Sequence, residues 1–550
     1  MWEFIWLFFI CTPLFLLPSN FSKNSIKTKI LYASVFYMLL YSTIGLLFEL
    51  VKIPISITNT SILIIFIDLA LLIILYKKKI IRPISMNFKQ QLKTISKNDM
   101  ALFLILIVSF IAYYFSQLQY FPLLAPDSYY WFSGLNYIKA TGQMFLENDV
   151  LHWYPDGFHY LTGITLLPFS ASMSFTLVKF FGPMFGVLTI LTLWEYFGDN
   201  TKFMRISSIL YSLLMPYLIV RFSMFIPEPL GLFLIAFTAL IVKKNYLNPI
   251  VLGALFGLFT NVYHSTGMLL FVLVGVILWI SKINNKKYYV GAYFIASIFY
   301  LLPYIMDIGG VLVYEKHLTE FGFSPNFWLY GIYASGIVFF ADFGAKALII
   351  GFPIGILFPL VLWKYKAKDK AILFSSILLV FSVILGLSFY LFESGLAYRY
   401  KPLFSIGSAL LFPYFITFVE ENIQNIFNRK NLKKIVYCVV ILILINRALI
   451  VTFSPPDIRR AEISEEDSRM MLWIDDNLPN SAIIVLDNNI YSSEIILYPR
   501  KIVNIKNINE INTTEYYFLT KNSLLDGDEF IHSEGNLTLT IRHSNLNRLI

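Results

Sequence analysis

The stretch FPLLAPDSYYWFSGLNYIKATGQMFLENDVLHWYPDGFHY, residues 121–160, separates two hydrophobic blocks of the chain. It contains four acidic residues, two histidines and many aromatic residues, but Lys139 is its only basic residue. Acidic side chains held together at a membrane surface cost free energy, so such a loop needs a specific reason. The stretch therefore predicts a site on one face of a membrane protein.

The composition of the 550-residue chain is that of a membrane protein. Hydrophobic residues make up 57% and charged residues 14%, whereas soluble proteins average about 25% charged residues. The net charge of +9 lies in short loops between apolar blocks, so it orients the chain and does not indicate nucleic-acid binding. Cys11 and Cys438 lie within apolar stretches and imply no disulfide framework. Because Met1 leads directly into an apolar run, no cleaved signal peptide is expected.

About 20 apolar residues cross a bilayer as a helix, and on this basis the sequence predicts a polytopic α-helical membrane protein with about fourteen transmembrane helices. The expected spans lie near residues 3–18, 29–50, 61–76, 100–116, 172–197, 203–220, 229–242, 249–263, 265–281, 288–305, 346–363, 371–391, 402–419 and 435–452. Residues 158–170 and 329–341 can form a further span or a re-entrant helix. Asp68 lies in the middle of a span, and we expect it to hydrogen-bond to a neighbouring helix.

Basic residues gather in every second loop, most densely in residues 77–97, 364–370 and 429–434. By the positive-inside rule these loops are cytoplasmic. The amino terminus, the acidic stretch and everything after residue 452 are then external. The pattern predicts a multi-pass protein of the plasma membrane with its clustered acids on the external face.

The chain divides into three parts by hydropathy. We expect N-terminal transmembrane helices and a basic cytoplasmic loop in residues 1–99, and a main transmembrane module with a large first external loop (117–171) in residues 100–452. Residues 453–550 are more polar and predict a small extracytoplasmic α/β domain. It should contain one helix that ends at Pro479, followed by β-type runs at 482–486, 494–498, 501–505 and 516–520.

Asp127 follows Pro126 just beyond the fourth expected span, where it should lie in the first turn of a surface helix. Aromatic residues on one side and a stop at Gly142 are typical of an amphipathic helix in the membrane interface. A carboxylate at this position can serve chemistry, and it can equally stabilise the helix dipole.

The following loop supplies three further acids, Glu147, Asp149 and Asp156. Glu147 and Asp149 lie two positions apart and can bind one hard divalent cation, while Asp156 also suits a turn. The two histidines, His152 and His159, lack the spacing of a zinc site, and we expect them to act as aromatic residues at the membrane interface.

Two more groups of candidate residues lie at predicted external ends of spans. Glu228 is held between Pro227 and Pro229, and Arg221 can pair with it or bind phosphate. His264 lies in a tight external turn. Arg399 and Lys401 lie at headgroup depth, where they can bind a lipid phosphate or act as snorkelling anchors.

The order of these residues resembles that of a known enzyme family. Asp127, Tyr129, Tyr130, Gly142, Asp149 and the motif WYPDG (153–157) resemble the first external loop of the catalytic subunit of oligosaccharyltransferases. These enzymes belong to the GT-C superfamily of membrane glycosyltransferases, which use polyprenyl-phosphate donors. Further along the chain, Glu228, the turn NVYHSTG (261–267), Arg399 and the helix MLWIDDN (471–477) are similar to later features of that family. The family's W-W-D-Y-G signature is absent, and residues 485–490 (VLDNNI) stand in its place.

The resemblance implies a GT-C-like module that transfers a sugar or oligosaccharide from a polyprenyl- or dolichyl-phosphate donor to an external glycan, lipid or protein acceptor. It implies that Asp127 is the general base or a cation ligand and that Glu228 is a second catalytic acid. A Mg or Mn ion would be held by Asp127, Asp149 and Glu228, and Arg399, with Lys401 and Arg221, would contact the phosphate. His159, His264 and Tyr129 are further candidates. Membrane lipids would be partners, and nucleic acid would not. The alternative is a transporter or a flippase for lipid-linked glycans, without transferase activity.

Overall fold

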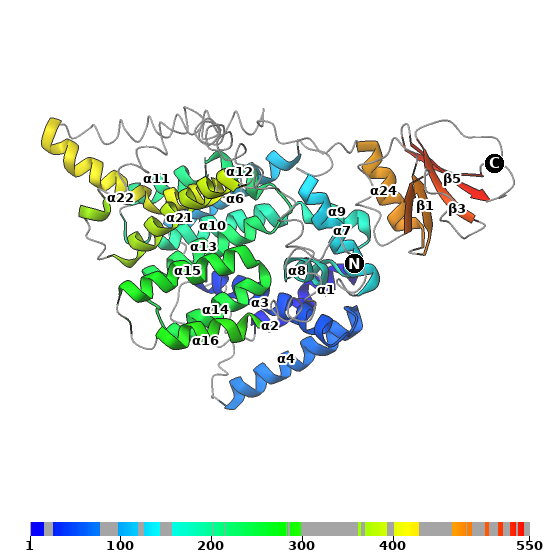
Figure 1. Cartoon of the computed structure of the whole chain (residues 1–550), viewed down its shortest axis with the longest axis horizontal. Helices are drawn as coiled ribbons and strands as arrows, with labels where there is room; N and C mark the ends of the chain where they lie inside the picture. The colour runs from blue at the N-terminus through cyan, green and yellow to red at the C-terminus, as the bar shows by residue number, and fades with distance from the viewer. Residues whose placement is uncertain are drawn as a thin grey trace.

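A computed structural model describes the main helices of the chain and a C-terminal sheet (Figure 1). The described residues are 2–15, 26–77, 97–118, 126–142, 157–200, 202–213, 215–281, 283, 286–298, 361–364, 369–392, 401–427, 465–479, 481–486, 501–504, 515–520, 529–534 and 537–543. The first helices are α1 (Trp2–Ile10), α2 (Thr12–Phe15), α3 (Ile26–Leu50), α4 (Ile57–Lys77), α6 (Lys97–Leu118), α7 (Pro126–Thr141), α8 (Gly157–Leu166), α9 (Ala171–Val178) and α10 (Phe181–Tyr196). The later helices are α11 (Lys202–Leu213), α12 (Pro216–Phe222), α13 (Glu228–Lys243), α14 (Pro249–Val262), α15 (His264–Ile280), α16 (Lys286–Ala296), α21 (Lys370–Phe392), α22 (Lys401–Phe427) and α24 (Glu465–Asn477).

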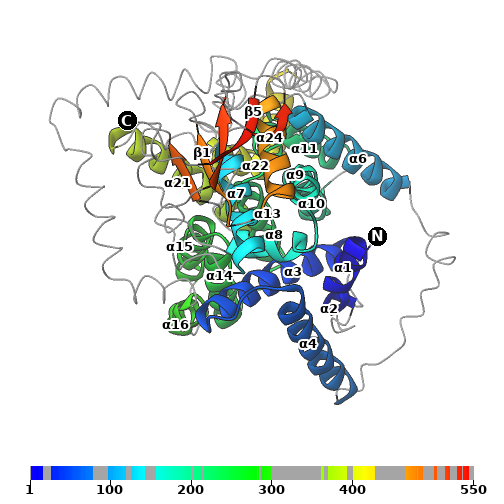
Figure 2. The ribbon, with the colours of Figure 1, turned by 90° about the vertical axis from the view of Figure 1, so that its right-hand side faces the viewer.

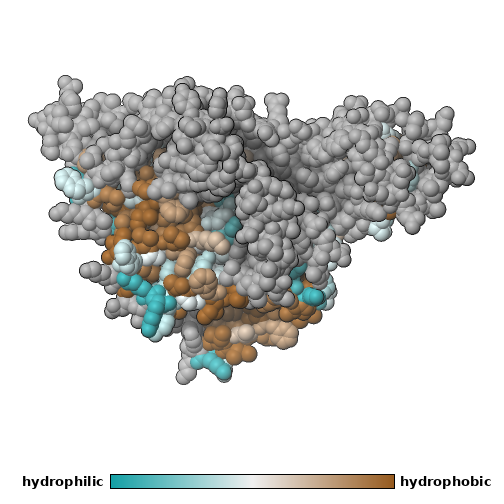
Figure 3. All heavy atoms as spheres, viewed as in Figure 1, coloured by the Kyte–Doolittle hydropathy of each residue, from teal (hydrophilic) through white to brown (hydrophobic). Residues whose placement is uncertain are grey.

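The helices fall where the hydrophobic blocks predict them. Within the described residues, three helical stretches are long and apolar enough to cross a membrane, namely Lys27–Leu50, Ile57–Lys77 and Ala171–Tyr196, the last of which comprises α9 and α10. Several shorter apolar helices accompany them. Hydrophobic side chains also gather on the surface of the helical body (Figure 3). The chain is therefore a mostly helical membrane protein.

The boundaries of some expected spans differ from the sequence prediction. The stretch 203–220 is two helices, because Pro216 cannot continue α11 and instead begins α12. The stretch 3–18 is broken after α1, and α2 is short. The expected spans at 346–363 and 435–452 lie wholly or largely outside the described residues.

Close backbone contacts join the helices of the body. In α14, a Cβ atom at Gly253 or Gly257 would lie 2.2 or 2.5 Å from the carbonyl oxygen of Tyr289 or Tyr293 in α16. Small residues of this kind let two helix backbones approach each other, which is how helices pack where lipid offers no hydrophobic driving force. The α14–α16 pair is therefore fixed by backbone shape.

Helix α8 is embedded in the body and held by the N-terminal helices. The Trp6 indole donates to the carbonyl of Ile164 at 2.9 Å, and the Ser42 hydroxyl donates to the carbonyl of Gly157 at 2.8 Å. Gly45 leaves room for the ring of Tyr160. Helices α1 and α3 therefore position α8 from one side.

The predicted interfacial position of the helix after Pro126 is wrong. Helix α7 is buried on more than one side, whereas an interfacial helix would be buried on one side only. Its buried residues include Trp131, Phe132, Leu135, Asn136 and Ile138. The reason is that α8 and α9 pack on α7 and cover it. The predicted stop is confirmed, because Gly142 has a φ of +73°, which favours glycine.

Helix α4 projects from the body, as Figure 2 shows. Only 11% of its apolar window is buried inside the protein, and Ile65, Phe66 and Ile73 are exposed. The predicted hydrogen bond of Asp68 is confirmed, since the Thr12 hydroxyl donates to its carboxylate at 2.6 Å. A polar contact of this kind attaches an otherwise lipid-facing helix to α2.

The C-terminal strands form one five-stranded sheet in the order β2-β1-β3-β5-β4. The strands are β1 (Ile483–Leu486), β2 (Lys501–Asn504), β3 (Glu515–Thr520), β4 (Glu529–Glu534) and β5 (Leu537–His543). β1 pairs in parallel with β2 and β3, whereas β5 is antiparallel to β3 and β4. Three predicted runs are confirmed, and the run at 494–498 lies outside the described residues. The β4–β5 hairpin was missed, although Gly535-Asn536 is a two-residue hairpin signal.

The glycine contacts give a stability prediction. We expect Gly253→Ala to lower the free energy of unfolding in detergent by about 1–3 kcal/mol, because the added methyl group would overlap a backbone carbonyl that cannot change rotamer. The matched control is Gly291→Ala in α16, where nothing lies within 4 Å of the added Cβ. The control should be neutral or more stable, since alanine favours helix over glycine. Equal melting temperatures of the two variants would contradict the prediction.

Candidate functional site

The structure describes the predicted site residues to different extents. The side chains of Arg221, Glu228, His159 and His264 are described. Asp127 and Tyr129 are the second and fourth residues of α7, and Lys401 is the first residue of α22. The remaining predicted residues, Glu147, Asp149, Asp156 and Arg399, lie outside the described residues.

Arg221 and Glu228 form an ion pair between the end of α12 and the start of α13. Arg221 Nη1 lies 2.7 Å from Glu228 Oε2, and the side chains are 10% and 15% exposed. Of the two alternatives left open for Arg221, the structure shows pairing with Glu228. Removing one partner of such a buried pair leaves an uncompensated charge, which typically costs about 3–5 kcal/mol.

The start of α7 lies beside the loop that joins α12 to α13. The backbone N–H of Phe225 donates to Ser128 Oγ at 3.2 Å, and Ser128 is the residue after Asp127. The Phe225 ring also packs on Phe158 of α8, with ring centroids 5.4 Å apart. The first turns of α7 and α8 therefore meet at the loop that precedes Glu228.

The start of α15 joins the same group. At Gly157, the first residue of α8, an added Cβ would lie 2.1 Å from the carbonyl oxygen of Asn261, close to the end of α14. At Gly231, in the first turn of α13, it would lie 2.4 Å from Thr266 Oγ1, in the first turn of α15. The N-terminal ends of α7, α8, α13 and α15 are thus brought together, and we call this group the N-terminal cluster.

The N-terminal cluster has a defined electrostatic character. The first N–H groups of a helix lack partners within the helix, and the helix dipole places partial positive charge there. Such ends bind anions and phosphate groups. Asp127 and Glu228 lie in the first turns of α7 and α13, where their carboxylates also suit the dipole. Arg221 adds a cation beside Glu228, so the cluster can hold an anion next to a carboxylate.

His264 is the first residue of α15, and its Nε2 lies 3.2 Å from Ser265 Oγ. It therefore belongs to the N-terminal cluster by position, because Tyr263 and Thr266 on either side contact Gly231. The sequence missed Ser128 and Gly157 as members of this cluster. The signals available for them were local, a serine after Pro-Asp and a glycine in a turn, and neither reveals its distant partner.

The expected interfacial position of His159 is wrong. The ring is completely buried and stacks on Trp131 at 4.2 Å, in space that Gly134 leaves open. Neither ring nitrogen has a hydrogen-bond partner among the described residues. Burial lowers the pKa of His159 to about 3, so the ring is neutral at physiological pH. It acts as an apolar contact between α7 and α8.

The predicted cation site is incomplete in the described part of the chain. No group of three histidine, cysteine or acidic side chains there could hold a metal ion. Of the predicted ligands, Glu228 faces Arg221, and Asp149 lies outside the described residues.

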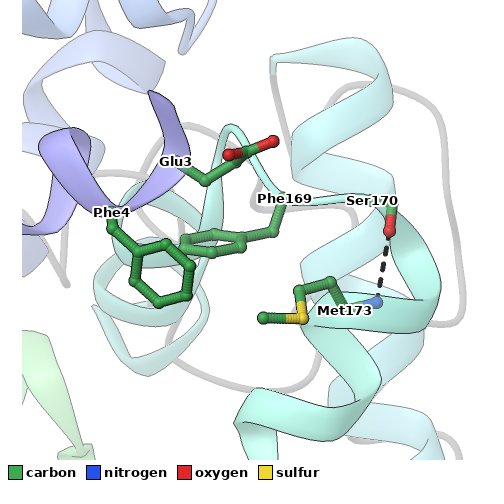
Figure 4. A pocket seen from close by; sticks show the side chains of 5 residues that line it. All are labelled: Glu3, Phe4, Phe169, Ser170 and Met173. Atoms are coloured by element: carbon green, nitrogen blue, oxygen red, sulfur yellow. Dashed lines mark hydrogen bonds between the residues drawn. The ribbon is translucent and has the colours of Figure 1, made fainter. Parts of the chain in front are cut away.

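A small cavity of about 210 Å³ lies apart from these residues, between α1 and the start of α9 (Figure 4). It is lined by Glu3, Phe4, Phe169, Ser170 and Met173. Its aromatic and thioether side chains face one another, and none of the predicted site residues lines it. The cavity therefore adds no polar groups to the candidate site.

Comparison with known proteins shows a likeness of fold. No family model and no curated protein sequence matches the chain. Among solved structures, ArnT from Cupriavidus metallidurans bound to undecaprenyl phosphate is 10% identical, with a TM-score of 0.52 over 80% of this chain and 98% of that chain. The Archaeoglobus fulgidus oligosaccharyltransferase tethered to an acceptor peptide is 11% identical over 76% of this chain and 69% of that chain, with a TM-score of 0.46. The chain therefore resembles ArnT in fold.

The buried histidine gives a pH prediction. In the folded protein His159 stays neutral down to about pH 3, whereas in the unfolded chain it takes up a proton near its ordinary pKa of 6.5. Between these values the unfolded state binds more protons, so stability falls as the pH falls from 6.5 towards 3. We expect His159→Phe, which keeps the ring stack on Trp131, to lose about 2 kcal/mol less than the wild type between about pH 7.5 and about pH 5.

The measurement is the free energy of unfolding in mixed detergent micelles at the two pH values. The comparison is made within each protein, so a constant cost of fitting the larger phenyl ring cancels. An identical acid-induced loss in wild type and His159→Phe would show that His159 is not the group responsible.

Proposed function

We propose that the chain is a membrane glycosyltransferase that transfers a sugar or oligosaccharide from a polyprenyl-phosphate donor to a hydroxyl acceptor on the external face. The observation that carries the proposal is the N-terminal cluster, where four helix starts meet beside a buried arginine and two first-turn acids. The likeness of fold to ArnT supports the same class of donor, because that protein was bound to undecaprenyl phosphate.

The chemistry of the donor fits this cluster. The acceptor oxygen attacks the anomeric carbon, the bond from that carbon to the phosphate oxygen breaks, and its electron pair leaves with the phosphate. The negative charge that develops on the leaving group needs electrostatic stabilisation, which helix N–H groups and the Arg221 guanidinium can supply. Arg399 and Lys401 are further proposed phosphate contacts. The acceptor proton passes to a carboxylate, and we assign this role to Asp127.

Glu228 is proposed as the second acid of the site. In the structure its carboxylate is paired with Arg221, so a phosphate that attracts Arg221 would compete with Glu228 for the guanidinium. A Mg or Mn ion held by Asp127, Asp149 and Glu228 would neutralise phosphate charge when bound. The loop acids Glu147 and Asp156 are proposed to face the acceptor.

The membrane topology is part of the same proposal. About fourteen helices cross the plasma membrane, and residues 453–550 form an external α/β domain that follows the transmembrane module. The contact of α24 with α9 supports this arrangement, because α9 also packs on α7, which contains Asp127. The first external loop and the C-terminal domain then lie on one side of the membrane.

A transporter or flippase is the alternative, and the position of Asp68 does not favour it. A coupled transporter places its acids near the middle of the membrane, in broken helices that line a pathway. Asp68 instead accepts a hydrogen bond from Thr12, and α4 is peripheral and largely exposed.

The proposal predicts the effect of neutralising Asp127. Purified wild type should consume a radiolabelled polyprenyl-phosphate sugar in detergent, and Asp127→Asn should be slower by roughly 10²–10⁴-fold, the usual contribution of acid–base catalysis. The matched control is Asp199→Asn, which removes an exposed acid paired with Lys243. The control should turn over like the wild type. Addition of EDTA then tests whether a cation takes part.

Two outcomes would contradict the proposal. If Asp127→Asn folds and consumes the donor at the wild-type rate, Asp127 is not the base. If the wild type consumes no donor but moves a lipid-linked glycan across reconstituted vesicles, the flippase alternative replaces the transferase. In that case Asp68→Asn should impair transport, whereas Asp127→Asn should not.

A further inference from the structure

The C-terminal unit, which consists of α24 and the five-stranded sheet, is attached to the helical body through the carboxylate of Asp476. Asp476, near the end of α24, accepts hydrogen bonds from the backbone N–H groups of Ala171 at 2.8 Å and Ser172 at 3.3 Å. It also accepts one from the Ser172 hydroxyl. Ala171 and Ser172 are the first two residues of α9, so a side chain 304 residues away caps this helix.

The cap is complete within the first turn of α9. The N–H of Met173 donates to Ser170 Oγ at 3.2 Å, which Figure 4 shows, so the first three N–H groups of α9 all have partners. A carboxylate suits this position because it accepts charge-assisted hydrogen bonds at the positive end of the helix. Part of this cap therefore comes from α9's own turn and part from the C-terminal unit.

From the other side, α7 holds the same turn. Lys139, near the end of α7, donates through Nζ to Ser174 Oγ of α9 at 2.7 Å and to the carbonyl of Phe169. The rings of Phe132 and Phe175 join the two helices further along, with centroids 5.1 Å apart at an angle of 86°. Residues 169–175 are thus fixed between Asp476 of α24 and Lys139 of α7.

We infer that Asp476 is a positioning residue, through which docking of the C-terminal unit orders α9 and hence α7, the helix that begins with Pro126 and Asp127. The inference rests on the proposed function for its catalytic consequence. Its structural part, the coupling of α24 to α7 through α9, is independent of that function.

Hydrogen–deuterium exchange tests the structural part. Asp476→Ala should speed amide exchange at the start of α9, because two N–H groups lose their acceptor, and also in the first turns of α7. Asp476→Asn keeps one carbonyl oxygen as an acceptor and should restore part of the protection. The matched control is Asn477→Ala, since Asn477 is exposed and its side chain bonds to the carbonyl of Trp473 in its own helix.

Kinetics test the catalytic part with the full-length protein. Asp476→Ala should lower kcat by about 10–100-fold, as expected when a catalytic group is misplaced by a fraction of its working distance. The KM for the polyprenyl-phosphate sugar should change little, because Asp476 is not one of the proposed phosphate contacts. Lys139→Met, which breaks the α7–α9 contact from the other side, should lower kcat to a similar extent. The kcat of the double variant should be no lower than that of the less active single variant, because both changes interrupt one path.

The outcomes separate this inference from the proposed function. Faster exchange in α9 without any change in α7 would overturn the coupling, whatever the activity. A wild-type protein that consumes no donor would remove the proposed function, while the exchange data would still decide whether Asp476 orders α7. Additive losses in the Asp476→Ala and Lys139→Met double variant, or normal kcat in Asp476→Ala, would overturn the positioning role.

Discussion

The arrangement of the proposed site depends on one close backbone contact. Gly157 lies against Asn261 and Val262, and the contact leaves no space for a Cβ atom. It joins the start of α8 to the end of α14, and α15 begins two residues after that end. A contact between two backbones cannot relax through a rotamer change, so it fixes the helix ends more firmly than side-chain packing does. Separate contacts add α7 and α13 to this arrangement, since the Phe225 N–H donates to Ser128 and Gly231 lies against Thr266.

The charges at this meeting point are more than helix caps require. An acid in a first turn stabilises the helix dipole, so Asp127 and Glu228 by themselves are consistent with a structural role. A buried arginine is different, because its desolvation has to be offset by a partner. Arg221 obtains that offset from Glu228 at 2.7 Å. The pair therefore keeps a buried cation at the start of α13, neutralised by Glu228 in this structure.

The helices could be predicted from the sequence because a bilayer requires long apolar runs, and basic residues gather in every second loop between these runs. The structure brings the predicted residues Arg221 and Glu228 together with the start of α7, while the assignment of a site to them stays a prediction. What failed were statements about neighbours distant in sequence. The burial of α7 and of His159 depends on α8 and α9, which no local pattern around residue 127 contains. The cap from Asp476 joins residues too far apart for any spacing rule, and the β4–β5 hairpin was missed because its strands, EFIHSE and LTLTIRH, contain many polar residues.

The Asp476 cap has a consequence for biosynthesis. Ala171 and Asp476 are 305 residues apart, which a ribosome working at about 5–20 residues per second translates in about 15–60 s. During that interval α9 exists without its carboxylate partner, and the bond of Ser170 to Met173 is the local cap it has from the start. The helical body is therefore synthesised before the carboxylate that caps the first two N–H groups of α9, and α24 completes this helix only after the intervening chain has been made.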